Sequence, residues 1–105
     1  MNEWIRDLIL RGGQVAEMPS RYKDDDAFWL DGREIAHFEG DQVLDLRLTR
    51  SVISARRATL KSDPRVELRP GSDWVTVRVG RADAALLDEL VQWAIDANRR
   101  SVRRR

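Results

Sequence analysis

Hydrophobic and polar positions alternate along the centre of the chain in a way that predicts two β-hairpins. The segment from Phe28 to Leu48 reads FWLDGREIAHFEGDQVLDLRL, and Asp31-Gly32 lies between two of its apolar runs. Asp-Gly favours the type I′ turn of a two-residue hairpin, because both central residues of that turn need a positive φ. A second turn is expected at Glu39-Gly40-Asp41-Gln42. The region therefore predicts three consecutive antiparallel strands.

The spacing of apolar residues predicts three helices outside this region. The first covers about Asn2 to Arg11 and ends at Gly12-Gly13, where a left-handed cap fits. The second begins at Thr49 or Ser51, either of which can cap it, and runs to about Leu60. The third begins at Asp83 and carries the longest apolar stripe of the chain, which ends at Ala97.

The remaining segments complete an α+β fold. Val66 to Arg69 and Trp74 to Val79 predict another hairpin, whereas Met18 to Asp26, with its proline and three aspartates, is expected to be a loop. The order α-β-β-β-α-β-β-α predicts an antiparallel sheet of about five strands with helices packed on one face. We expect one domain over residues 1–98 and a flexible, basic C-terminal tail over residues 99–105.

Composition narrows the classes of function. The chain has no cysteine, which excludes disulfide frameworks and thiol catalysis and fits a cytoplasmic location. No apolar run has the length of a membrane span or of a signal peptide, so no membrane association is expected. The last seven residues hold five of the 19 basic residues, so the first 98 carry a net charge of −4. Any nucleic-acid affinity should therefore be weak and concentrated in the tail.

His37 is the one residue whose side chain titrates near neutral pH unaided. The expected register pairs it with Leu44 on the core face, where a lone histidine is more often a hydrogen-bonded structural residue than a catalytic one. The alternative is a small enzyme that uses His37 as acid or base with a nearby carboxylate, Glu39, Glu34 or Asp45. No metal or other cofactor is expected, because a transition-metal site usually needs three or four protein ligands and the chain offers no other histidine or cysteine.

A second group of residues is expected on the opposite, mixed face of the sheet. There the side chains of Trp29, Glu34, Arg47 and Trp74 could line a shallow ligand groove with aromatic walls and a few fixed charges. The alternative is an ordinary solvent-facing surface on which Glu34 and Arg47 form a cross-strand ion pair.

Basic residues form two candidate contacts for nucleic acid. One is a stripe on the second helix and the other is the end of the chain: Arg50, Arg57, Lys61, Arg103, Arg104 and Arg105. The alternatives are a solvated helix face for the stripe and a solubility tail for the terminal arginines.

The chain resembles a family of small proteins described as luciferase domain proteins. The resemblance rests on the segments GREIAHFEG, VLDLRLTR and RPGSDWVTVRV followed by a closing helix, and it extends from about Trp4 to Asn98. The matching positions are Arg33, Glu34, Ile35, His37, Gly40, Asp45, Pro70 and Trp74. The resemblance implies no catalytic residue, cofactor or light-emitting reaction.

This chain departs from the family where relatives often have further histidines. A second histidine commonly follows the first after two residues, where this chain has Glu39, and another lies near the position of Val66 or Glu67. A site built from those histidines would be mostly missing here. We therefore expect a small binding or interaction module whose partner is an unidentified small molecule or protein, with the enzyme and the weak nucleic-acid binder as alternatives.

Overall fold

The structure, a computed structural model, describes residues 2–103 and forms one antiparallel sheet with helices. The elements are α1 (Glu3–Leu10), β1 (Ala16–Pro19), β2 (Asp26–Leu30), β3 (Arg33–Gly40), β4 (Val43–Arg47), α2 (Arg50–Ala55), α3 (Arg57–Lys61), β5 (Val66–Leu68), β6 (Trp74–Arg78), the 3-10 turn η1 (Arg81–Asp83) and α4 (Ala84–Arg103). The six strands lie in the order β1-β2-β3-β4-β6-β5. The predicted α+β class is confirmed, with one strand more than expected.

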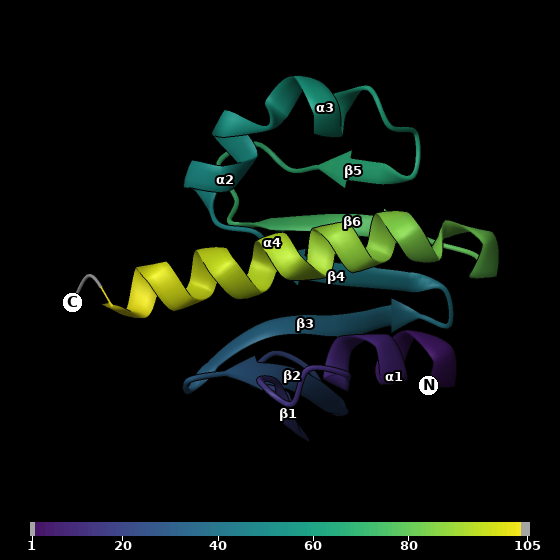
Figure 1. Cartoon of the computed structure of the whole chain (residues 1–105), viewed down its shortest axis with the longest axis vertical. Helices are drawn as coiled ribbons and strands as arrows, with labels where there is room; N and C mark the ends of the chain where they lie inside the picture. Colours follow the sequence, from purple (N-terminus) through teal and green to yellow (C-terminus); the bar gives the residue numbers. More distant parts are fainter. Residues whose placement is uncertain (1, 104–105) are drawn as a thin grey trace.

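The long helix α4 covers one face of the sheet (Figure 1). It contacts β2, β3 and β4, α1 packs beside it, and α3 contacts the edge strand β5. The core lies between α4 and the sheet and includes Phe28, Leu44, Leu46, Val75, Val77, Leu87, Leu90 and Ala94. Fully burying a side chain of the size of leucine or phenylalanine contributes about 1.5–3 kcal/mol, so this layer supplies much of the stability of the fold.

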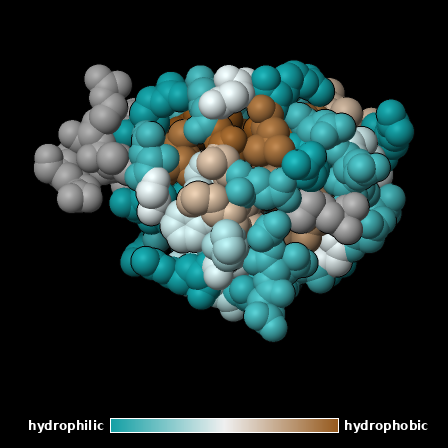
Figure 2. Space-filling view, turned by 90° about the horizontal axis from the view of Figure 1, so that it is seen from below, coloured by the Kyte–Doolittle hydropathy of each residue, from teal (hydrophilic) through white to brown (hydrophobic). Residues whose placement is uncertain are grey.

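Hydrophilic residues cover most of the face seen from below in Figure 1, and hydrophobic residues gather in one patch towards the side on which α4 lies (Figure 2).

Among residues 2–103, no helix combines the length and the hydrophobicity that crossing a bilayer requires.

Several local predictions are confirmed. Asp31 and Gly32 have φ values of 50° and 80°, as a type I′ turn requires, and Leu30 pairs with Arg33 directly across that turn. The hydroxyl of Thr49 accepts the backbone N–H of Val52 and caps α2. Asp83 directly precedes α4.

Other boundaries differ from the expectation. The strand β1 extends into the segment predicted as a loop, up to Pro19, and pairs with β2 through Ala16 opposite Trp29. The predicted second helix is divided at Arg56 into α2 and α3, because the backbone there leaves the helical region. The helix α4 extends to Arg103, while Arg104 and Arg105 lie outside the described residues. The division of the chain at residue 98 stays a prediction.

The register of β3 differs from the predicted one on both of its sides. Phe28 pairs with Ala36 rather than Ile35, which makes Ile35 an extra residue in β3. On the other side of β3, His37 pairs with Asp45 rather than Leu44, and the turn closes at Asp41-Gln42 rather than Gly40-Asp41. His37 therefore does not share a face with Leu44.

Candidate functional site

A β-bulge at Ile35 brings Glu34 and His37 to the same face of the sheet. Residues three apart normally point to opposite faces of a strand, because side chains alternate. The extra residue lets both Ile35 and Ala36 face the core, where they are 1% and 0% exposed. Glu34 and His37 then lie on the face away from α4 and contact each other.

His37 is held between two carboxylates on that face. Its Nδ1 lies 2.9 Å from an oxygen of Glu34, and its Nε2 lies 3.2 Å from an oxygen of Asp45. The three side chains are only 8%, 2% and 3% exposed, in the order His37, Glu34, Asp45. Glu34 also accepts the hydroxyl of Ser20 and the backbone N–H of Arg21, at 2.8 and 2.6 Å. The prediction that His37 is buried is right, but its surroundings are polar.

These contacts shift the pKa of both His37 and Asp45 toward the charged forms. Burial by itself lowers the pKa of His37, but the hydrogen bonds and charges of Asp45 and Glu34 outweigh burial and raise it. Burial would raise the pKa of Asp45, yet the hydrogen bonds from His37, Thr76 and Arg69 hold it well below its usual range. The arrangement favours an imidazolium between two carboxylates.

Two further cations complete the cluster. Arg69 Nη2 and the hydroxyl of Thr76 donate to one oxygen of Asp45, at 2.9 and 2.7 Å. Lys23 Nζ donates to one oxygen of Glu39 at 2.6 Å, and the other oxygen of Glu39 lies 3.4 Å from His37 Nε2. One ligand atom each from His37, Glu39 and Asp45 lies within 4.8 Å of the other two. These three side chains could therefore hold a metal ion.

Aromatic rings surround the imidazole of His37. Its centroid lies 4.9 Å from the ring of Trp74 and 6.0 Å from the ring of Tyr22. Tyr22 and Trp74 also contact each other edge to face at 5.8 Å.

A cavity of about 390 Å³ lies beside this cluster. Its walls include all four residues that the sequence suggested for a ligand groove: Trp29, Glu34, Arg47 and Trp74. The expected ion pair between Glu34 and Arg47 is not present among the described residues. Arg47 instead contacts Asp73 and Asn98, and on the other side of β4 the pairing with β3 begins at Ala36 opposite Leu46, so Glu34 has no paired residue in β4.

The cavity wall carries several hydrogen-bond donors without an acceptor. Trp29 Nε1 is buried and has no hydrogen-bond partner in the described part of the chain. Arg21 and Arg33 also line the cavity, and neither guanidinium forms an ion pair with a carboxylate among residues 2–103. Burial lowers the pKa of Arg47, and the nearby charge of Arg33 lowers it further. Positive charge and unused N–H groups therefore gather at this wall.

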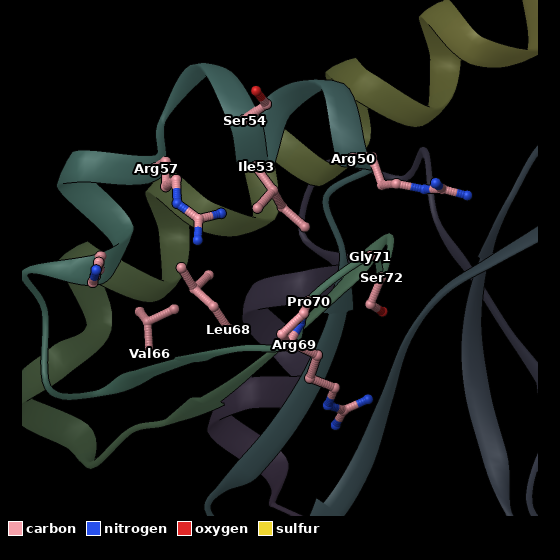
Figure 3. Close-up of a pocket in the computed structure, with 11 residues that line it drawn as sticks. Arg50, Ile53, Ser54, Arg57, Val66, Leu68, Arg69, Pro70, Gly71 and Ser72 are labelled. Atoms are coloured by element: carbon pink, nitrogen blue, oxygen red, sulfur yellow. The ribbon is translucent and has the colours of Figure 1, made fainter.

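The basic residues of the predicted helix stripe surround a different cavity, of about 430 Å³, between α2, α3 and the β5–β6 hairpin (Figure 3). Arg57 points into it, above Leu68, whereas Arg50 extends away from it (Figure 3). Lys61 also lines this cavity. The side chains of Arg103, Arg104 and Arg105 lie outside the described part of the structure, so their role in nucleic-acid binding stays a prediction.

Several residues of the site were missed from the sequence. Ser20, Arg21 and Tyr22 come from the segment expected to be a loop, and nothing in their spacing indicates that they fold back over β3. The face on which Thr76 lies could be predicted, because Thr76 alternates with Val75 and Val77 and therefore lies on the same face as Trp74. Arg69 had no such signal.

The comparisons with known proteins give one match. A family model described as Luciferase domain matches residues 32–94, more than half of the chain. The matched span contains His37, Glu39, Asp45, Trp74 and Thr76, and it begins after the segment that holds Tyr22 and Trp29. No curated protein and no solved structure matches the chain.

Proposed function

The chain belongs to the luciferase domain family, and we propose that this member is a binding module for a small, anionic, planar molecule held in the cavity between Trp29 and Trp74. The observation that carries the proposal is the set of unused donors on the cavity wall. Trp29 Nε1, Arg21 and Arg33 all offer N–H groups that no described residue accepts. Arg21 is exposed and Arg33 is half-buried, so both guanidiniums are accessible from the cavity, and a ligand that supplies acceptor oxygens gains charge-assisted hydrogen bonds there.

Charge and shape support the same ligand class. The two carboxylates of the wall already have partners, since Glu34 accepts three hydrogen bonds and Asp73 accepts those of Arg47 and the backbone N–H of Arg50. The arginines that line the cavity therefore leave an excess of positive charge. The rings of two tryptophans and a tyrosine lie among the polar groups that dominate the wall, and the volume falls within the range of about 300–1,000 Å³ typical of ligand pockets.

The enzyme alternative has less support from the geometry. Both ring nitrogens of His37 already contact carboxylates, so an acid or base role towards a substrate would first have to break one of these contacts. His37 is better suited to hold Glu34 and Asp45 in place beside the cavity.

Binding of 2-naphthoate and of its neutral counterpart 2-naphthamide, followed by tryptophan fluorescence, tests the proposal. We expect naphthoate to bind more tightly than naphthamide, and Arg33→Gln to weaken naphthoate binding at least fivefold while leaving naphthamide unchanged. The matched control is Arg78→Gln, because Arg78 is exposed on β6 and does not line the cavity. Equal binding of the two compounds, or equal effects of the two substitutions, would contradict the proposal.

A further inference from the structure

We propose that His37, Glu39 and Asp45 bind one divalent first-row transition-metal ion, with Zn²⁺ as the probe for that class. The proposal does not depend on ligand binding in the neighbouring cavity. It rests on two observations. One ligand atom of each side chain lies near a common point, and the other polar atom of each side chain is held by a neighbouring residue.

Two of the three distances between the converging atoms match those around a bound ion, and the third, between the oxygens of Glu39 and Asp45, is within 4.8 Å. His37 Nε2 lies 3.2 Å from an oxygen of Asp45 and 3.4 Å from an oxygen of Glu39. Ligand atoms about 2.0–2.2 Å from a Zn²⁺ ion lie roughly 3.0–3.5 Å apart in tetrahedral or octahedral geometry. Glu39 is the most exposed of the three, at 36%, so its carboxylate has the freedom to close the site.

The second polar atom of each side chain is already fixed by another residue. His37 Nδ1 contacts Glu34, the arrangement that orients most metal-binding histidines. The far oxygen of Asp45 accepts hydrogen bonds from Arg69 and Thr76. The far oxygen of Glu39 accepts from Lys23. Each side chain is thus held by one atom while its other atom faces the common point.

No metal was expected from the sequence, because a site usually needs three or four protein ligands and the chain offers no second histidine or cysteine. The observed register adds Asp45 directly opposite His37 and so brings the number of ligands to three. When the ion binds, Nε2 of His37 loses its proton to the solvent, and its lone pair coordinates the ion. Three protein ligands leave at least one position for water or a small molecule, as in metal sites that bind substrates.

The test uses the full chain without a histidine tag, treated with a chelator and then titrated with Zn²⁺ by calorimetry. We expect one ion per chain. Glu39→Gln should weaken binding at least tenfold, and the matched control Glu67→Gln, an exposed glutamate on β5, should leave it unchanged. Glu39 lies at the end of β3 and is partly exposed, so this variant should keep the fold.

The ¹⁵N signals of the imidazole ring provide an independent readout, because His37 is the only histidine of the chain. Zn²⁺ should shift the Nε2 signal and leave Nδ1 protonated and bonded to Glu34. Binding that leaves both ring signals unchanged, binding that is equally tight in Glu39→Gln, or no binding at millimolar Zn²⁺ would each overturn the proposal. The first two results would place the ion elsewhere, for example at Asp24-Asp25-Asp26.

Discussion

Replacing Glu34 with alanine should strongly destabilise the fold, because this carboxylate is the shared acceptor of three donors. It accepts Ser20 Oγ, Arg21 N and His37 Nδ1 within 2.9 Å, and its side chain is 2% exposed. Removing one partner of a buried charge pair costs about 3–5 kcal/mol, since the other charge stays buried without compensation. We therefore expect Glu34→Ala to lower the free energy of unfolding by about 3–5 kcal/mol.

The size of this loss is large for a domain of 105 residues. Small domains have a total stability of about 5–15 kcal/mol. Each kcal/mol lowers the melting temperature by roughly 4–8 °C in chains of this size, so Glu34→Ala should melt at least about 12 °C lower. Glu34→Gln keeps the side-chain volume and an acceptor oxygen, so it should lower the free energy of unfolding by less than Glu34→Ala.

Urea unfolding followed by tryptophan fluorescence measures these differences. The control is Glu67→Ala, because Glu67 is 63% exposed and its nearest cationic partner, Arg78, is 3.8 Å away. That substitution should change stability by about 0.5 kcal/mol or less. The amide of Arg21 should also exchange faster with solvent in Glu34→Ala, since it loses its acceptor. A loss no larger than that of Glu67→Ala would refute the view that Glu34 anchors the site.

Three further predictions concern the fold and the end of the chain. Asn98→Ala should cost about 1–3 kcal/mol in urea unfolding, because the buried amide of Asn98 donates to the backbone carbonyl of Arg47 and ties α4 to β4; an unchanged midpoint would contradict this. Gly32→Ala should cost about 1–2 kcal/mol by the same assay, because Gly32 has a φ of 80°, and a neutral effect would argue against the type I′ turn. Binding to a generic DNA duplex should be weak, weaken steeply as salt rises and vanish when residues 99–105 are removed. Salt-insensitive binding that survives this truncation would place the contact on α2 and α3.

Local signals were enough to predict most of the elements but not their pairing. The Asp31-Gly32 turn and the cap at Thr49 depend on one or two residues, and both are confirmed. The strand β1 was missed because Ala16–Pro19 contains a proline and is largely exposed, as an edge strand allows. Its pairing with β2 depends on residues distant from it in the sequence.

More of the candidate ligand groove than of the surroundings of His37 could be predicted from the sequence. Trp29, Glu34, Arg47 and Trp74 were assigned to one face from alternation alone, and the structure brings them to one cavity. His37 was assigned to the wrong face because strict alternation was carried through Ile35 and Ala36. Two adjacent apolar residues between polar ones interrupt the period of two, and that interruption was the available signal of a bulge.

The bulge in β3 accounts both for the wrongly predicted face of His37 and for the polar cluster of the site. Without the extra residue, Glu34 and His37 would point to opposite faces, and one of the two ionisable side chains would enter the apolar layer beneath α4. With it, Ile35 and Ala36 both pack in the core, while Glu34, His37 and Asp45 meet on the other face. A departure from the regular pattern is therefore what lets one short strand serve the core and the polar cluster together, and such departures are expected where a fold carries its function.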